Sequence, residues 1–307
     1  MTPVPAPTDS PALRLHAVSK RFGQELALDD VSFEAPRGSV FALLGANGAG
    51  KTTAIRILLG LAAPDAGRAE VLGLDSATQS LEIRRRVGCV AERPTLYEWM
   101  SVDEIGWFAA GFHDPQFLPR YRELAAQYGL PANRKIKELS KGMRAKAALA
   151  LALGNDPELL ILDEPTSGLD PLVRREFLES MVDRAAAGKT VFLSSHQLSE
   201  VERVADYIAI LRQGRLVLVD RLEQLKCDIC EVTITLAPDA VQPPELPGEI
   251  LRQRRRARQW QLLARSSSLD AANRLLESID VADVAVRTPS LEEIFTGYMQ
   301  SPEQTAT

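Results

Sequence analysis

Cysteine is scarce in this 307-residue chain, which contains only Cys89, Cys227 and Cys230. Three cysteines are too few for the disulfide framework of a small secreted domain, and their number fits a reducing compartment. Cys227 and Cys230 have the CxxC spacing of zinc and redox sites, but the sequence around them offers no further cysteine or histidine ligand. We therefore expect ordinary packing for this pair and a cytoplasmic location for the protein.

Long apolar runs are also missing from the chain. The longest apolar stretches, such as residues 147–153, are far shorter than the roughly 20 residues that span a bilayer, so we expect no transmembrane helix. The first eleven residues contain four prolines and have neither a positively charged segment nor an apolar run. This composition predicts a flexible leader over residues 1–12 rather than a signal peptide.

Neither sign of charge dominates, because 36 basic residues stand against 41 acidic ones and the net charge is -5. Such a balance excludes a general attraction to polyanions, so we expect no nucleic-acid partner, and any phosphate binding must be local. Hydrophobic residues at 45% and charged residues at 25% are typical of globular domains. The length suits two domains of roughly 100 to 200 residues each.

Strand-like and helix-like segments alternate through the first two thirds of the chain. An apolar run at residues 40–45 enters a glycine-rich turn, and apolar residues with the helical period follow over 54–61. Uninterrupted apolar runs at 159–162 and 190–195 predict buried parallel strands. Between them a helix should begin at Pro171, with one apolar face made of Leu172, Phe177, Leu178 and Met181. This alternation predicts an α/β fold with a parallel sheet.

The rest of the chain is organised around that sheet. Short strand-like runs over residues 13–74 predict an antiparallel β subdomain, and a capping box of Ser101 and Glu104 opens a helical insertion over about 95–154. A hairpin and a helical connector should close the first domain, 13–226. Residues 227–299 contain alternating strands, two helical segments and a second capping box, at Ser290 and Glu293, which predict a small α+β domain before a tail at 300–307.

A glycine-rich loop carries the strongest chemical signal. Gly45, Gly50, Lys51 and Thr52 satisfy the GxxxxGK-plus-Ser/Thr pattern of a P-loop, between a buried strand and a helix. Its glycines let backbone N–H groups surround phosphates, the lysine reaches the terminal phosphates, and the threonine hydroxyl ligates magnesium. We therefore expect MgATP to bind this loop, whose other nucleotide-binding residues are Asn47, Gly48 and Thr53.

A pair of acids ends the apolar run at 159–162. Asp163 leaves the carboxyl end of a predicted buried strand, where ligands bind in open α/β sheets, and can anchor the magnesium ion. Glu164 follows directly and can orient the attacking water in phosphoryl transfer, which makes it a candidate catalytic residue together with Lys51. Taken alone, the two acids could instead cap a helix.

A third element, LSKGM at residues 139–143, stands before a predicted helix. On its own it would be an ordinary cap made by Ser140. However, the order of these elements along the chain is that of one protein family. They are the phosphate loop, the helical insertion, LSKGM, LLILDEP, SGLD at 167–170 and His196. Over about residues 13–220 the chain resembles the ATP-hydrolysing subunits of ABC transporters.

This resemblance implies roles for residues that the motifs alone leave open. Phe22 would stack on adenine, and His196 would contact the γ-phosphate as a third catalytic residue. Ser140 and Gly142 would bind the γ-phosphate of ATP held by a second chain, with Asp170 joining the two sites. It also implies a P-loop NTPase fold, a homodimer or a heterodimer with a second ATPase chain, a transmembrane permease as partner, and a peripheral position on the inner face of the cell membrane.

Two positions depart from the commonest family pattern. Lys141 and Met143 replace Gly and Gln of LSGGQ, yet the helix N-terminus can still approach phosphate and the lysine adds positive charge. Glu92 stands where the family usually has a magnesium-contacting Gln, and a carboxylate there can still ligate magnesium. Both variants, and the segment SLEEIF at 290–295, are similar to bacterial export-type subunits.

Several features allow two interpretations. The basic run from Arg252 to Arg258 could contact lipid phosphates or nucleic acid, although a solvated hairpin tip is the simpler interpretation. The aromatic residues of the helical insertion could be core or could meet the membrane partner; they are Trp99, Trp107, Phe108 and Phe112. The rival function is a soluble ABC protein acting on ribosomes or DNA, but this chain has one ATPase cassette and no long coiled coil.

Overall fold

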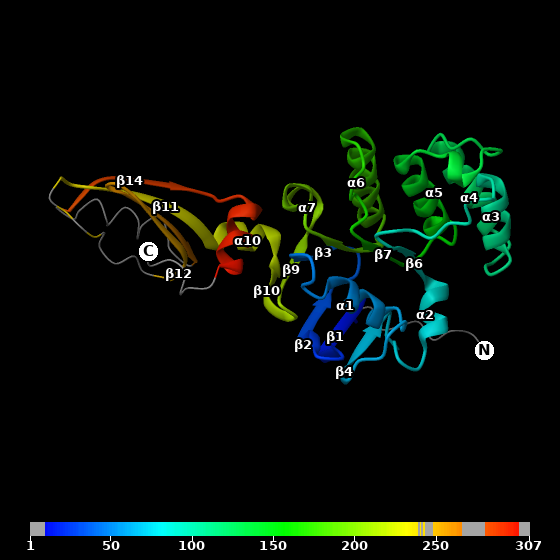
Figure 1. Ribbon diagram of the computed structural model, residues 1–307, viewed down its shortest axis with the longest axis horizontal. Helices are drawn as coiled ribbons and strands as arrows, with labels where there is room; N and C mark the ends of the chain where they lie inside the picture. The colour runs from blue at the N-terminus through cyan, green and yellow to red at the C-terminus, as the bar shows by residue number, and fades with distance from the viewer. Residues whose placement is uncertain (1–9, 239, 241, 243–247, 266–279, 301–307) are drawn as a thin grey trace. The chain divides into compact units, whose positions relative to one another are not determined.

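The computed structural model describes residues 10–238, 240, 242, 248–265 and 280–300. The chain divides into two compact units, Met1–Val219 and Asp220–Thr307, shown as a ribbon in Figure 1. Parts of three sequence-based expectations lie outside the described residues. They are most of the leader, the first of the two helical segments of the second domain, and residues 301–307 of the tail.

Two sheets form the framework of the first unit. Six strands in the order β10-β9-β3-β8-β7-β6 make the larger sheet, in which β9, β3, β8, β7 and β6 are parallel. Their bounds are Val40–Gly45 (β3), Val87–Val90 (β6), Leu159–Asp163 (β7), Thr190–Ser195 (β8), Tyr207–Arg212 (β9) and Arg215–Arg221 (β10). The smaller, antiparallel sheet has the order β2-β1-β4-β5, with bounds Leu13–Phe22 (β1), Glu25–Ala35 (β2), Ala66–Val71 (β4) and Leu74–Asp75 (β5). The predicted α/β fold with its antiparallel subdomain is confirmed.

One hydrophobic core joins the two sheets. Every residue of β3, β7 and β8 is buried, as uninterrupted apolar strands of a covered parallel sheet should be. Phe33 of β2 stacks on Phe41 of β3 with ring centroids 5.4 Å apart, and Phe41 stacks on Phe192 of β8 at 5.7 Å. This packing holds β3 against β2 of the smaller sheet, and the phosphate loop leaves from the carboxyl end of β3.

Helices of the first unit follow the predicted strand–loop–helix order. Helix α1 (Lys51–Leu58) begins at the phosphate loop, and α2 (Ser80–Arg86) precedes β6. Helix α6 (Pro171–Ala186) is capped by Asp170, and α7 (Leu198–Val204) follows β8. The predicted core position of Leu172 is wrong, since its side chain is 68% exposed. Leu172 and the buried Met181 are separated by about two and a half helical turns, which puts them on opposite sides of α6.

The helical insertion has a core of its own. It contains α3 (Val102–Ala110), α4 (Phe117–Gln127), the short 3-10 helix η1 (Ile136–Glu138) and α5 (Lys141–Leu153). Helices α3, α4 and α5 lie side by side (Figure 1). The capping box of Ser101 and Glu104 is present. A Cβ at Gly106 would lie 2.0 Å from the Tyr121 ring, so only glycine lets α3 approach α4 this closely. No helix among the described residues is long and apolar enough to cross a membrane.

The second unit contains an antiparallel sheet in the order β12-β13-β11-β14. Its elements are α8 (Leu222–Asp228), β11 (Ile229–Leu236), β12 (Glu249–Arg256), β13 (Gln259–Arg265), β14 (Val281–Arg287) and α10 (Leu291–Met299). The unit begins at Asp220, whereas the sequence placed the boundary after Lys226. Helix α8 belongs to this unit because it contacts β11, and Asp220 forms an ion pair with Arg265 of β13 at 3.1 Å.

The basic run of the second unit is mostly strand, not hairpin tip. Arg252 lies on β12, is 11% exposed and approaches the buried carboxylate of Glu231 at 3.6 Å. Arg255 lies over the Trp260 ring at 5.5 Å, and Arg258 donates to the Leu236 carbonyl at 3.0 Å. The predicted tip is wrong for Arg252, because pairing with β13 draws the run into the sheet. Three of the arginines therefore have structural contacts.

Candidate functional site

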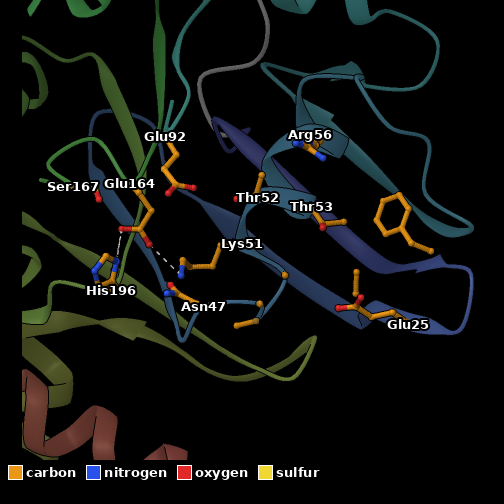
Figure 2. Close-up of a pocket in the computed structure, with 15 residues that line it drawn as sticks. Glu25, Asn47, Lys51, Thr52, Thr53, Arg56, Glu92, Glu164, Ser167 and His196 are labelled. Atoms are coloured by element: carbon orange, nitrogen blue, oxygen red, sulfur yellow. Dashed lines mark hydrogen bonds and ion pairs between the residues drawn. The ribbon is translucent and has the colours of Figure 1, made fainter. Parts of the chain in front are cut away.

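A cavity of about 700 Å³ opens where β3 ends and α1 begins. Ten residues predicted from the sequence line it together: Phe22, Asn47, Gly48, Gly50, Lys51, Thr52, Thr53, Glu92, Glu164 and His196. Figure 2 shows the charged side chains of this set pointing toward a common space. The segments that supply them come from β1, the phosphate loop, the loop after β6, and the ends of β7 and β8.

Glycine is required at the start of α1. Gly50, the residue before the helix, has φ of 106°, a conformation that side chains rarely adopt, and a Cβ there would lie 2.4 Å from the Ala27 carbonyl oxygen. A Cβ at Gly45 would meet the Leu211 carbonyl oxygen at 2.8 Å. The loop therefore keeps its backbone accessible at a helix N-terminus, where N–H groups and the helix dipole favour phosphate.

Lys51 is 6% exposed and is held from both sides. Its Nζ donates to the Gly45 carbonyl at 2.7 Å and lies 3.1 Å from Glu164 Oε1, in an ion pair. A buried ammonium group requires such partners, since its charge is costly to remove from water. The side chain thus presents a fixed positive charge to the cavity.

Glu164 connects Lys51 with His196. Its Oε2 lies 2.7 Å from His196 Nδ1, so the three side chains form a continuous chain of polar contacts (Figure 2). Glu164 directly follows β7 and has φ of 49°, in the left-handed region that non-glycine residues rarely adopt. Its backbone N–H donates to the Ser194 carbonyl and to Ser194 Oγ, each at 3.1 Å. These contacts aim the carboxylate into the cavity.

Thr52, Asp163 and Ser194 form a second polar group beside this chain. Thr52 Oγ1 donates to Asp163 Oδ2 at 2.9 Å, and Ser194 Oγ donates to Asp163 Oδ1 at 2.6 Å. Among the described residues, no three His, Cys, Asp or Glu side chains converge as a metal cage. Magnesium needs no such cage, because it usually takes one or two protein carboxylates together with phosphate and water. The hydroxyl of Thr52 and the carboxylates of Asp163 and Glu92 fit that requirement.

Four polar residues near the site were given no role from the sequence. Glu25, Arg56 and Ser167 line the cavity, and Ser194 holds Asp163 and Glu164. Ser194 had a detectable signal, because a hydroxyl inside an apolar buried strand needs a partner. The register of β7 with β8 places Ser194 opposite Asp163.

Ser140, Gly142 and Asp170 do not line the cavity. Ser140 accepts a hydrogen bond from the Met143 N–H at 3.2 Å and so caps α5, while Asp170 caps α6. A Cβ at Gly142 would lie 3.3 Å from Val173 Cγ2 and 3.7 Å from Asp170 Oδ2, so the starts of the two helices are close neighbours. The structure therefore gathers these three residues at a second place in the same unit.

Aromatic side chains of the helical insertion are exposed. Trp99, Trp107 and Phe112 are 65%, 67% and 70% exposed, and Phe108 packs edge-on against Phe112 with ring centroids 5.5 Å apart. Core packing is therefore wrong as an account of these three side chains. The insertion's core is built instead from other residues, among them Phe117 and Tyr121.

Comparison with known proteins gives consistent matches. The family described as ABC transporter matches residues 28–167. An uncharacterized ABC transporter ATP-binding protein of Nostoc sp. is 44% identical over 207 residues, which are 65% of this chain and 61% of that protein. Daunorubicin resistance ATP-binding protein DrrA3 of Streptomyces coeruleorubidus is 34% identical over 298 residues, covering 92% of this chain and 94% of its own.

Further similarity extends to an export protein and to a solved structure. Nod factor export ATP-binding protein I of Ralstonia nicotianae is 35% identical over 240 residues, or 75% of each chain. The solved ATP-binding subunit of an ABC transporter matches with a TM-score of 0.65 and 32% identity, over 70% of this chain and 92% of that one. The phosphate loop and the two acids that end β7 agree with this similarity. Because a relative 34% identical aligns over 92% of this chain, the chain belongs to the family of ABC transporter ATP-binding proteins, which are the ATPases of such transporters.

Proposed function

We propose that the chain binds MgATP in the 700 Å³ cavity, with each predicted residue in a defined role. The backbone of the phosphate loop and Lys51 hold the β- and γ-phosphates, and the exposed ring of Phe22 stacks on adenine. Thr52, Asp163 and Glu92 hold magnesium, which when bound neutralises developing phosphate charge. The observation that carries the proposal is the convergence of Lys51 and Thr52 with the two acids that end β7.

Hydrolysis is assigned to Glu164 and His196. Glu164 accepts a proton from, or orients, the water that attacks the γ-phosphate, and its burial and its bond to His196 support this role. His196 is within 2.7 Å of the carboxylate and can contact the γ-phosphate from the same side. Both groups are fixed by the adjacent strands β7 and β8, so little reorganisation is needed for catalysis.

We propose that two chains close around two ATP molecules, as a homodimer or with a second ATPase chain. Support comes from the position of Ser140 and Gly142, which stand at the N-terminus of α5 outside the cavity of their own chain. Ser140 Oγ accepts the Met143 N–H as a cap, and its own O–H is still able to donate to a phosphate. A helix N-terminus also favours a phosphate bound from elsewhere. Asp170, which is next to Gly142, would then join the two sites.

A membrane permease is the proposed partner, and the chain would be peripheral on the inner face of the membrane. The exposed aromatic side chains of the helical insertion supply a surface for it, since large apolar groups in contact with one another mark interaction sites. Export is the proposed direction. It is supported by the names of two relatives, a daunorubicin resistance protein and a Nod factor export protein, the first of which aligns with 92% of this chain.

Two experiments test this function. The purified chain should hydrolyse ATP with magnesium and lose this activity with EDTA or in Glu164→Gln. Affinity purification from its native host should recover a polytopic membrane protein. Recovery of ribosomes or DNA instead, with no membrane protein, would favour the rival function of a soluble ABC ATPase.

A further inference from the structure

A buried carboxylate outside the nucleotide cavity has no role in the mechanism described so far. Glu200 lies on α7, four positions after His196, and is 8% exposed. It does not line the nucleotide cavity. Burying a carboxylate is unfavourable unless hydrogen bonds or an opposite charge compensate, so the partners of Glu200 indicate what it holds.

Glu200 holds the loop that joins β7 to α6. Thr166 Oγ1 donates to Glu200 Oε2 at 2.7 Å, and Arg174 Nη1 lies 2.8 Å from Glu200 Oε1. Arg174 Nη2 in turn donates to the carbonyl of Leu169 at 3.1 Å. Both Thr166 and Leu169 belong to residues 164–170, which we call the catalytic loop because it begins at Glu164 and ends at Asp170.

Two side-chain contacts therefore run in parallel from one short segment to the catalytic loop. His196 reaches Glu164 at 2.7 Å, and Glu200 reaches Thr166 at 2.7 Å. Inside the loop, Thr166 accepts a backbone hydrogen bond from Leu169 at 3.1 Å. The Ser167 N–H donates to the Glu164 carbonyl at 3.1 Å, so holding Thr166 restrains the loop on both sides of it.

The loop needs such an anchor because its first residue is strained. Glu164 has a left-handed backbone, with φ of 49°, which is unfavourable in a non-glycine residue and persists only where surrounding contacts enforce it. Without the Thr166 contact, the loop could relax toward an ordinary conformation. The carboxylate of Glu164 would then leave its position beside Lys51 and His196.

We propose that Glu200 is a positioning residue, which acts through Thr166 and Arg174 to keep Glu164 and Asp170 in their working places. The proposal rests on the catalytic role given to Glu164 above. Because Glu200 is outside the cavity, its loss should lower kcat and leave KM for ATP nearly unchanged. A residue that only stabilised the fold would change the amount of folded protein and leave kcat per folded chain unchanged.

The test uses steady-state ATPase kinetics of the full chain, with the concentration of folded protein checked by thermal unfolding. Glu200→Gln and Thr166→Val should each lower kcat about 10- to 100-fold with KM within about twofold, since a displacement of about 1 Å can cost about 100-fold. Thr166→Ser keeps the hydroxyl and should stay within about twofold of wild type. Glu179→Gln, which changes an exposed glutamate of α6, is the matched control.

A double variant distinguishes positioning from independent effects. Added to Glu164→Gln, the Glu200→Gln change should cause no further loss, because both act through one carboxylate. Additive losses, an unchanged kcat in Thr166→Val, or a raised KM with normal kcat would each overturn the proposal, provided that Glu164→Gln itself shows the expected slow turnover. Wild-type turnover in Glu164→Gln would instead overturn the catalytic role on which it rests.

Discussion

Thr52 Oγ1 donates a hydrogen bond of 2.9 Å to Asp163 Oδ2, although the two residues are 111 positions apart in the chain. Thr52 lies in the first turn of α1, which follows β3, and Asp163 ends β7. Strand β8 lies between β3 and β7 in the sheet. Ser194, on β8, donates to the other oxygen of Asp163 at 2.6 Å. The parallel sheet thus brings a hydroxyl and a carboxylate to one edge, where both can serve the same metal ion.

Thr52→Ala should raise the magnesium concentration needed for half-maximal ATPase activity, by about tenfold, because a ligand and the bond that orients Asp163 are both lost. Thr52→Ser, which keeps the hydroxyl, is the control and should behave as wild type. A magnesium titration of ATPase rate measures this. The same magnesium requirement in Thr52→Ala and wild type would remove Thr52 from the metal site.

Glu164→Gln should bind MgATP and hydrolyse it at least about 100-fold more slowly, since a positioned base contributes roughly 100- to 10,000-fold. The variant should accumulate as an ATP-bound dimer, because the step that separates the chains is blocked. Phosphate release and size-exclusion chromatography with ATP measure the two effects. Normal turnover with no extra dimer would contradict the assignment.

Lys51→Ala should weaken ATP binding by the monomer, whereas Ser140→Ala should weaken ATP-driven dimerisation. Lys51 faces the cavity of its own chain, so its loss should remove most ATP affinity of the monomer. Ser140 stands outside that cavity and should leave monomer affinity within about twofold, while ATP-driven dimerisation weakens by about 1 kcal/mol or more for one lost hydrogen bond to phosphate. ATP affinity is measured at protein concentrations below and above the one at which the chains dimerise. The lower concentration reports binding to the monomer, and the higher one reports dimerisation. An equal loss of monomer affinity in both variants would contradict binding across two chains.

Contacts made by contiguous motifs could be predicted from the sequence. The phosphate loop, the acids that end β7, and the capping boxes at Ser101 and Ser290 are local patterns, and the structure contains each of them. Local rules work here because the caps bond backbone groups only three residues away, and a glycine-rich turn between a strand and a helix leaves few conformations.

Contacts that depend on strand pairing could not be predicted in this way. Ser194 meets Asp163 only because β8 pairs with β7 in one register, and Arg252 meets Glu231 only because β13 pairs with both β12 and β11. The role of Ser194 was therefore not predicted from the sequence, and Arg252 was predicted to lie at a solvated hairpin tip. Trp107 and Phe108 of α3 were ambiguous for another reason, since composition does not reveal which face of α3 meets α4.

The second unit should lose stability at acidic pH through Glu293. Hydrogen bonds from Arg287 and then from Ser290 lower the pKa of this carboxyl from 4.5 to about 2, against an opposing effect of burial. The folded state therefore keeps the carboxylate ionised where the unfolded state takes up a proton. Its stabilisation is full above about pH 4.5 and is lost as the pH falls toward 2. We expect this carboxylate to contribute about 2 kcal/mol to the free energy of unfolding. This value already allows for screening by solvent, because Arg287 is half exposed.

Hydrogen exchange of α10 and β14 in the full chain, compared at pH 5 and pH 3, measures this contribution. Glu293→Gln should lower protection at pH 5 and flatten its pH dependence relative to wild type. Glu292→Gln, which changes the exposed neighbour on the same helix, should have neither effect. Equal pH dependence in wild type and Glu293→Gln would exclude this pair as the cause.

The second unit should be dispensable for nucleotide binding, because every residue that lines the nucleotide cavity lies before Val219. A chain ended after Val219 should stay soluble and bind MgATP with an affinity within about twofold of wild type. A chain ended after Lys226 should be less soluble. It would retain Leu225, which is fully buried in the intact protein, without the strand β11 that α8 contacts, and exposing such a side chain costs about 1.5 to 3 kcal/mol.

We expect the chain ended after Val219 to show an altered ATPase rate or dimer lifetime, because the second unit is proposed to regulate the ATPase or to stabilise the dimer. Titration with a fluorescent ATP analogue and analytical ultracentrifugation compare the three chains. A Val219 chain that folds but cannot bind nucleotide would contradict the division of labour, whereas unchanged dimerisation and ATPase rate would contradict regulation alone.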